Sequence, residues 1–236
     1  MVKVLDFDEY SEDEEWSPPR RHLPPPPISR TKTLFLDLDR TLIHAYGGKP
    51  PIDYPYHFIV NVPTNERKKH LYYVTKRPGM DEFLRGAAEL FEVVIFTAAN
   101  EPYASRIVDK LDPEGRLISH RLYRDSCLPG RRGGFVKDLS GLGRDLKDVL
   151  IVDDKPQSYS LQKANGIPVA PFNGTNRDDR QLWWVAAILE KAITFDDVRN
   201  AVALYLAEKG DLDAANCNGP TIWNPRHVVA SRTQEN

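Results

Sequence analysis

The side chains best suited to chemistry in this sequence are four acids and one threonine, and each comes at or just after the end of a short apolar run. In chain order they are Asp37, Asp39, Thr97, Asp153 and Asp154. Short and almost unbroken apolar runs are typical of parallel strands covered on both faces. In an open α/β sheet, ligands bind outside the carboxyl ends of the strands. The sequence therefore predicts four carboxylates and a hydroxyl at one edge of a sheet.

Clustered carboxylates repel one another, and without a cation some of them would take up protons. An all-oxygen set without His or Cys favours Mg²⁺. Two acids two positions apart, such as Asp37 and Asp39, can divide the work of phosphate-ester hydrolysis, because one can attack phosphorus while the other exchanges protons. A turn or helix-capping role is the simpler interpretation of any single acid after a strand. Two acid pairs and Thr97 at successive strand ends favour chemistry.

The elements that must bring these residues together follow from apolar spacing. Strand-like runs cover residues 34–36, 91–96, 149–152 and 166–170. Helical periodicity covers residues 80–91, 103–111, 182–189 and 198–206. Alternating strands and helices predict an α/β fold with a Rossmann-like central parallel sheet flanked by helices. Residues 44–76 predict a β-hairpin, and residues 112–136, which are rich in Gly, Arg and Pro, predict a small β insertion.

Composition divides the chain into one domain and two tails. Residues 1–30 are acidic and then Pro-rich, a composition that cannot bury enough apolar surface to offset the entropy of ordering. We expect a disordered tail there, with a docking motif for a partner protein as the second interpretation. The predicted domain covers residues 31–208. Residues 209–236 form a C-terminal tail without sustained apolar periodicity.

Bulk properties argue against several functional classes. The 236 residues carry 32 Lys and Arg against 34 Asp and Glu, a net charge of −2, which is unlike a general nucleic-acid binder. Two cysteines cannot build a disulfide framework and favour a reducing compartment. No apolar run approaches the roughly 20 residues of a membrane span, and the acidic start is unlike a targeting peptide. We therefore expect an intracellular protein without membrane or direct nucleic-acid partners.

A series of motifs resembles one known family. The segment Asp37-Leu38-Asp39-Arg40-Thr41 is similar to the DxDxT motif of the haloacid dehalogenase-like superfamily. The motifs that follow are Arg77-Pro78-Gly79, Val94-Ile95-Phe96-Thr97-Ala98, Tyr123-Arg124-Asp125-Ser126-Cys127, Val136-Lys137-Asp138-Leu139-Ser140, Leu142-Gly143-Arg144-Asp145-Leu146 and Ile151-Val152-Asp153-Asp154-Lys155-Pro156. Together they resemble the small CTD phosphatases, which are named for the C-terminal domain of RNA polymerase II.

The resemblance implies a haloacid dehalogenase-type fold and a role for each motif residue. Asp37 would be the nucleophile and a Mg²⁺ ligand, and Asp39 would be the general acid/base that gives the metal its backbone carbonyl. Asp154 would ligate Mg²⁺, with Asp153 supporting it. Three residues would contact the substrate: Thr97, Arg124 and Lys137. Thr97 and Lys137 would also be catalytic.

The same resemblance implies a Mg²⁺-dependent protein phosphatase acting on phosphoserine or phosphothreonine through an aspartyl-phosphate. Its partner would be a phosphoprotein, with the RNA polymerase II C-terminal domain as a candidate, and a nuclear location is favoured over a cytoplasmic one. Two alternatives stay open: a small-molecule phosphatase of the same superfamily, and a non-catalytic binding module related to the mitochondrial translocase receptor subunit. The short segments between motifs favour the protein phosphatase, because a large cap would need a longer insertion.

Several positions depart from the family pattern, among them Ala99-Asn100, which replaces the usual Ser after Thr97-Ala98. Asp154 and Lys155 stand where the family usually has Asn and Ser, and Arg40 stands where Glu is common. The extra carboxylate keeps an oxygen ligand and should tighten metal binding. No motif assigns a role to Lys155.

Overall fold

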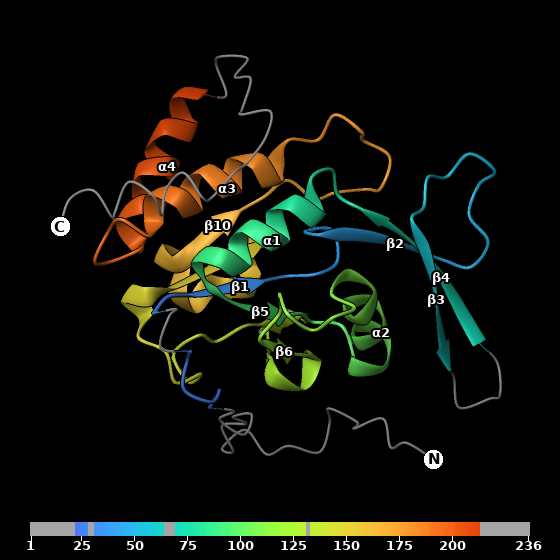
Figure 1. The fold of residues 1–236 in the computed structure, drawn as a ribbon, viewed down its shortest axis with the longest axis horizontal. Helices are drawn as coiled ribbons and strands as arrows, with labels where there is room; N and C mark the ends of the chain where they lie inside the picture. The colour runs from blue at the N-terminus through green and yellow to red at the C-terminus, as the bar shows by residue number, and fades with distance from the viewer. Residues whose placement is uncertain (1–21, 28–30, 64–68, 131–132, 213–236) are drawn as a thin grey trace.

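The computed structural model describes residues 22–27, 31–63, 69–130 and 133–212, the last five of these by backbone alone. Its centre is a five-stranded parallel sheet in the order β10-β9-β1-β5-β6 (Figure 1). The strands are β1 (Thr33–Leu36), β5 (Glu92–Phe96), β6 (His120–Leu122), β9 (Val149–Asp153) and β10 (Gly166–Pro168). The chain passes from β1 to β5 and β6 on one side and later to β9 and β10 on the other. This reversal beside β1 creates the switch point at which open sheets bind ligands.

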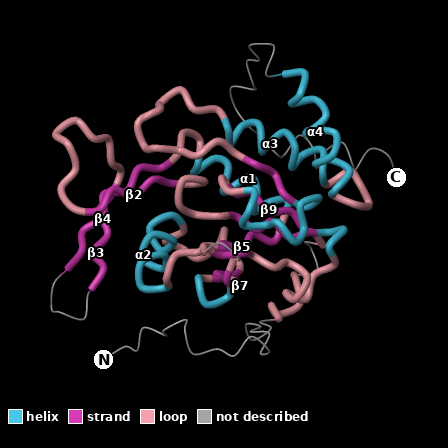
Figure 2. The backbone as a smooth tube through the Cα atoms, turned by 180° about the vertical axis from the view of Figure 1, so that it is seen from behind, coloured by secondary structure: helices cyan, strands magenta, loops and turns pink. Residues whose placement is uncertain are grey.

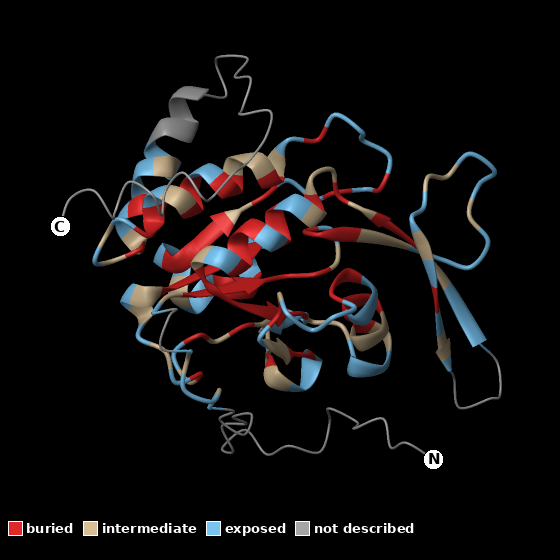
Figure 3. Ribbon diagram, viewed as in Figure 1, coloured by how far each residue is buried: buried red, intermediate tan, exposed pale blue. Residues whose placement is uncertain are grey.

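Alternate residues of the central strands point into two apolar cores. Leu34 and Leu36 of β1 pack with buried side chains of the α-helices. These are α1 (Met80–Leu90), α2 (Glu101–Leu111), α3 (Gln181–Ala192) and α4 (Arg199–Leu212). Phe35 points the opposite way, toward Leu142 and toward Tyr159 of the irregular 3-10 segment η4 (Pro156–Asn165). Burial on both faces, visible in Figure 3, explains why the strands read as unbroken apolar runs.

A three-stranded antiparallel sheet extends from the domain between β1 and α1 (Figure 2). Its strands, in spatial order, are β2 (Ile43–Gly47), β4 (Lys69–Lys76) and β3 (Phe58–Pro63). The β3–β4 pair confirms the predicted hairpin. The third strand, β2, was not predicted, because only its first residue is buried and its apolar pattern is weak. One face of this sheet meets α2 where the rings of Tyr72 and Tyr103 lie 4.8 Å apart.

The predicted β insertion at 112–136 is only partly correct. The short strands β7 (Leu128–Pro129) and β8 (Phe135–Val136) form an antiparallel pair, as expected. The strand β6 from the same stretch instead joins the edge of the main sheet beside β5. It has three residues, two of them His120 and Arg121, so apolar periodicity could not identify it. Short 3-10 turns are η2 (Arg124–Ser126) and η3 (Leu146–Asp148).

The predicted tails lie mostly outside the described residues, which leave out 1–21, 28–30 and 213–236. The described part of the Pro-rich stretch, residues 22–27, lies against the domain, although a free tail was expected there. Leu23 donates its N–H to the Leu142 carbonyl at 3.1 Å, and Arg144 donates to the Pro24 carbonyl at 2.6 Å. The boundaries at residues 30 and 208 stay predictions. No helix in the described part of the chain combines the length and apolarity needed to cross a bilayer.

Glu92, the first residue of β5, is a buried acid that joins three segments. It accepts hydrogen bonds from Arg144 at 2.7 and 2.8 Å and from Thr33 of β1 at 2.7 Å. Burial by itself would raise the pKa of Glu92, but the hydrogen bonds from Arg144 and Thr33 outweigh it and hold that pKa below its usual range. The carboxylate therefore contributes stability above its unfolded-state pKa, and this stability is lost as pH falls through the lower folded-state pKa.

We expect Glu92→Gln to lower the free energy of unfolding by about 3 kcal/mol at neutral pH, because Arg144 loses its buried counter-charge. This difference in the free energy of unfolding should shrink as pH falls through the folded-state pKa of Glu92, since the wild-type carboxyl then loses its charge and resembles the amide. Urea denaturation across this range measures both effects. The exposed pair of Glu114 with Arg116 supplies a control, because Glu114→Gln should cost less than about 1 kcal/mol. Wild-type stability of Glu92→Gln at neutral pH would contradict this account.

Candidate active site

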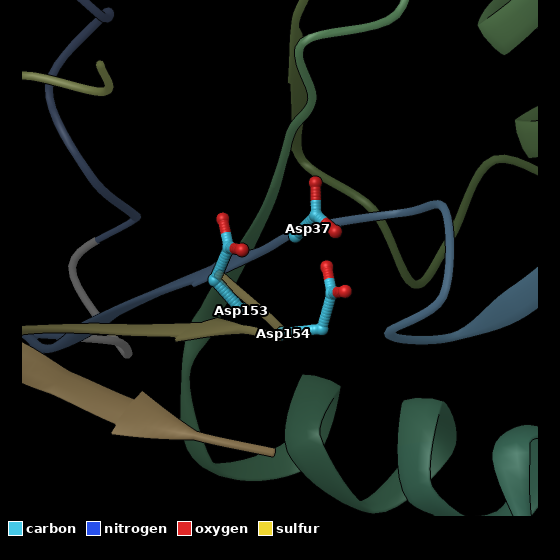
Figure 4. Close-up of side chains that lie close together, drawn as sticks. All are labelled: Asp37, Asp153 and Asp154. Carbon is cyan, nitrogen blue, oxygen red and sulfur yellow. The ribbon is translucent and has the colours of Figure 1, made fainter. Parts of the chain in front are cut away.

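The structure brings three of the predicted acids together at the carboxyl ends of β1 and β9. Asp37 directly follows β1, Asp153 ends β9, and Asp154 comes next. Figure 4 shows their side chains gathered at one point, and one oxygen from each lies within 4.8 Å of the others. The parallel register that pairs Leu36 with Val152 places them side by side.

Lys137, the residue after β8, lies between two of these carboxylates. Its Nζ donates to Asp37 Oδ1 at 2.7 Å and to Asp153 Oδ2 at 2.6 Å, and the residue is 1% exposed. Burial favours loss of its proton, but Asp37 and Asp153 outweigh that effect and raise the pKa of Lys137. The ammonium therefore stays charged and holds the two carboxylates in place.

Thr41 fixes the second oxygen of the Asp37 carboxylate. Its hydroxyl donates to Asp37 Oδ2 at 2.9 Å, and its oxygen accepts the backbone N–H of Asp154 at 3.1 Å. A tight turn after β1 brings Thr41 back to Asp37, with Arg40 in the left-handed region at φ 67°. Thr41 was not among the predicted site residues, although the threonine of the DxDxT motif was the signal for it.

The Asp39 side chain points toward α2 rather than into the carboxylate cluster. The Tyr103 hydroxyl donates to Asp39 Oδ1 at 2.5 Å. Loss of solvent raises the pKa of Asp39 to about 6; Asp37 adds to the rise and the hydrogen bond from Tyr103 opposes it. A carboxyl with this pKa can both release and accept a proton near neutral pH. Helical spacing placed Tyr103 in a helix but gave no sign of this contact.

All the predicted site residues line one open cavity of about 450 Å³. They are Asp37, Asp39, Thr97, Arg124, Lys137, Asp153 and Asp154. Thr97, just past β5, is buried, and its Oγ1 accepts the N–H of Ala99 at 3.1 Å. Arg124, after β6, is exposed and donates from Nε to the Ala98 carbonyl at 2.8 Å. The cavity thus lies over the ends of four adjacent strands of the sheet.

The three clustered carboxylates are a donor set suited to a hard divalent cation. Burial and the nearby Asp37 charge raise the pKa of Asp153 to about 6 and raise that of Asp154 as well, and a cation would relieve this repulsion. Both oxygens of Asp153 already have partners, since Oδ2 accepts from Lys137 and Oδ1 accepts the N–H of Lys155 at 2.7 Å. Both oxygens of Asp37 also accept hydrogen bonds, from Lys137 and from Thr41. Asp154 pairs with Arg40 at the longer distance of 3.5 Å and is the better placed ligand, whereas contributions from Asp37 and from the Asp39 carbonyl stay predictions.

Comparison with known proteins identifies the family. The sequence profile described as NLI interacting factor-like phosphatase matches residues 32–199, and the chain belongs to this family. The relatives place it with the small CTD phosphatases of the haloacid dehalogenase superfamily. The fission yeast RNA polymerase II CTD phosphatase Fcp1 has a related structure, with a TM-score of 0.51 and 21% identity over 87% of this chain and 62% of that one. This likeness shows a shared fold.

Two curated relatives illustrate the similarity in sequence. The chain is 46% identical over 168 residues to a probable C-terminal domain small phosphatase of Dictyostelium discoideum, covering 71% of this chain and 53% of the relative. It is 42% identical over 165 residues to human carboxy-terminal domain RNA polymerase II polypeptide A small phosphatase 1, covering 70% of this chain and 60% of the relative. The chain thus spans little more than half the length of these proteins.

A cation held by Asp37 and Asp154 would stabilise the folded protein by mass action. We expect millimolar Mg²⁺ to raise the Tm of the wild-type protein by about 2–4 °C, the shift expected for roughly 1 kcal/mol in a domain of this size. Asp154→Ala should lose most of this shift, whereas the exposed-site variant Glu114→Ala should keep it. Circular dichroism melting and titration calorimetry measure the effect. An undiminished shift in Asp154→Ala would remove Asp154 from the ligand set.

Proposed function

We propose that this chain is a Mg²⁺-dependent phosphatase that removes phosphate from phosphoserine or phosphothreonine in proteins. The main support is the position of the Asp37 carboxylate in an open cavity, where Lys137 and Thr41 hold it by hydrogen bonds. Asp39 lines the same cavity and can serve as a proton donor. The family and the names of the relatives support the same class of reaction. An open cavity suits a phosphorylated segment of a protein better than a small metabolite, which pockets usually enclose.

In the first step, Asp37 attacks phosphorus and the bond to the seryl oxygen breaks. Lys137 and Thr41 restrain the carboxylate in one orientation, and Lys137 offsets the charge of the incoming phosphoryl group. Protonated Asp39 gives its proton to the leaving oxygen, so that the serine departs as a neutral hydroxyl. Mg²⁺ bound at Asp37 and Asp154 would supply further charge neutralisation for the phosphoryl oxygens.

In the second step, Asp39 is ionised and accepts a proton from the attacking water. The new bond from water oxygen to phosphorus replaces the bond to Asp37, and free phosphate leaves while Asp39 returns to its protonated form. The hydrogen bond from Tyr103 keeps Asp39 aimed at the same place in both steps. Thr97 and Arg124 act on the substrate from the far side of the cavity, Thr97 at the phosphoryl group.

A phosphorylated protein segment is the substrate class that the relatives suggest. The human relative carries RNA polymerase II in its name. We extend the proposal to the phosphorylated C-terminal domain of RNA polymerase II as a candidate substrate, and with it to a nuclear location.

We expect Asp37→Asn to lower turnover of a phosphoserine peptide by about 10⁴-fold, since the amide keeps the shape of the carboxylate but cannot attack. Chelation should abolish wild-type turnover, and added Mg²⁺ should restore it. Phosphate release in a continuous assay measures both. Glu89→Gln, on the exposed side of α1, is the matched control and should keep wild-type activity. Activity that survives both the Asp37 substitution and chelation would refute the mechanism.

Replacing Asp39 with Asn tests the proton transfer by varying the leaving group. Serine needs a proton in order to leave, so we expect turnover of a phosphoserine peptide to fall by about 10²–10⁴-fold. Nitrophenolate leaves without one, so p-nitrophenyl phosphate should show a burst of about one equivalent followed by slow turnover, because only the water step is impaired. Stopped-flow absorbance measures the burst. Equal losses on both substrates, with no burst, would exclude Asp39 as the general acid.

A further inference from the structure

Lys155 is a positively charged residue of the cavity that has no role in the proposed mechanism. It follows the two acids of the β9 end, is exposed, and lines the cavity. Its backbone N–H donates to Asp153 Oδ1 at 2.7 Å, and Pro156 comes next. The backbone of Lys155 is therefore fixed beside the reacting groups, while its side chain reaches toward solvent.

Two carboxylates that line the cavity together with Lys155 are already engaged by other groups. Asp153 accepts from Lys137 at 2.6 Å, and Asp39 accepts from Tyr103 at 2.5 Å. Among the residues that the structure describes, no carboxylate forms an ion pair or hydrogen bond with the Lys155 ammonium. The positive charge at the end of this side chain therefore stays available to a bound substrate.

Arg40 balances the third carboxylate on this side of the cavity. Its Nε lies 3.5 Å from Asp154 Oδ2, and its side chain is half exposed. With Asp154 compensated by Arg40, Lys155 is left as an excess positive charge. Arg40, Asp154 and Lys155 together carry one net positive charge.

The strand order sets the distance between Lys155 and a phosphoserine bound over Asp37. β9 and β1 are neighbours, and adjacent strands lie about 4.8 Å apart. An extended peptide advances about 3.3 Å per residue. A lysine at the end of β9 can therefore reach a side chain one or two residues from the phosphoserine. Arg124 lies toward β6, across β1 and β5, and cannot serve the same position.

We propose that Lys155 is a specificity-determining residue that selects phosphoserine substrates with a second negative charge, a carboxylate or another phosphate, one or two residues away. The proposal rests on the phosphatase function proposed above. An exposed ion pair changes affinity by up to about fivefold, and salt screens it. The preference should therefore be modest at a carboxylate, larger at a phosphate, and weak in high salt.

Three phosphoserine peptides of equal length test this selection. They carry Ala, Glu or a non-hydrolysable phosphoserine analogue next to the phosphoserine, and p-nitrophenyl phosphate serves as a substrate without neighbours. We expect the wild-type kcat/KM for the Glu peptide to exceed that for the Ala peptide by about three- to fivefold at low salt. The peptide with the phosphoserine analogue should exceed the Ala peptide by a larger factor, because the analogue carries more negative charge than Glu.

The variants separate Lys155 from other lysines. Lys155→Ser should bring the Glu/Ala ratio close to one, and Lys155→Glu should invert it. Lys163→Ser, at an exposed lysine of η4 outside the cavity, should keep the wild-type ratio.

A Glu/Ala ratio of one in the wild-type protein, with all substrates turned over, would overturn the proposed selection and leave the proposed phosphatase function intact. Equal losses on every substrate in Lys155→Ser, p-nitrophenyl phosphate included, would mean that Lys155 acts on the phosphoryl group itself and would also overturn it. Turnover of none of the four substrates would refute the proposed function.

Discussion

The buried ammonium of Lys137 is the interaction on which the site depends. Two carboxylates from different strands, Asp37 and Asp153, lie within hydrogen-bond distance of the same Nζ, at 2.7 and 2.6 Å. Without a cation between them, two buried carboxylates this close would repel each other, and one of them would take up a proton. One lysine therefore lets the ends of β1 and β9 converge, and in the proposed mechanism the same positive charge offsets that of the incoming phosphoryl group.

The turn that carries Thr41 is held from behind by a second buried cation. Arg77 is almost fully buried, pairs with Asp179 through two hydrogen bonds of 2.8 Å, and donates to the Thr41 carbonyl at 3.1 Å. It also donates to the Ala170 carbonyl at 2.7 Å. These four hydrogen bonds, two of them to one carboxylate, exceed the three N–H donors of a lysine ammonium. Arg77 thereby holds the loop after β10 and the turn after β1 together, and this turn keeps Thr41 in place beside the Asp37 carboxylate.

The site combines features of the family with features of this chain. The Asp37, Asp39 and Lys137 arrangement lies within the motifs through which the chain resembles the small CTD phosphatases. Lys155 lines the same cavity, and Arg40 pairs with Asp154, which also lines it. Under the proposed function, the fold keeps the groups that would act on phosphorus, while residues one position away alter the charge around the bound phosphate.

Apolar spacing along the chain was enough to predict the strands that are buried on both faces, the four α-helices and the hairpin, and motif matching identified the acids at the strand ends. Apolar periodicity records burial along the chain, and β1, β5 and β9 are fully buried. It could not reveal the edge strand β6 or the weakly patterned β2, where burial is incomplete. The contacts of Lys137 with Asp37, across 100 residues of sequence, and of Tyr103 with Asp39, across 64, became visible in the folded chain alone. An ion pair or hydrogen bond depends on separation in space, and spacing along a chain carries that information only within one helix or strand.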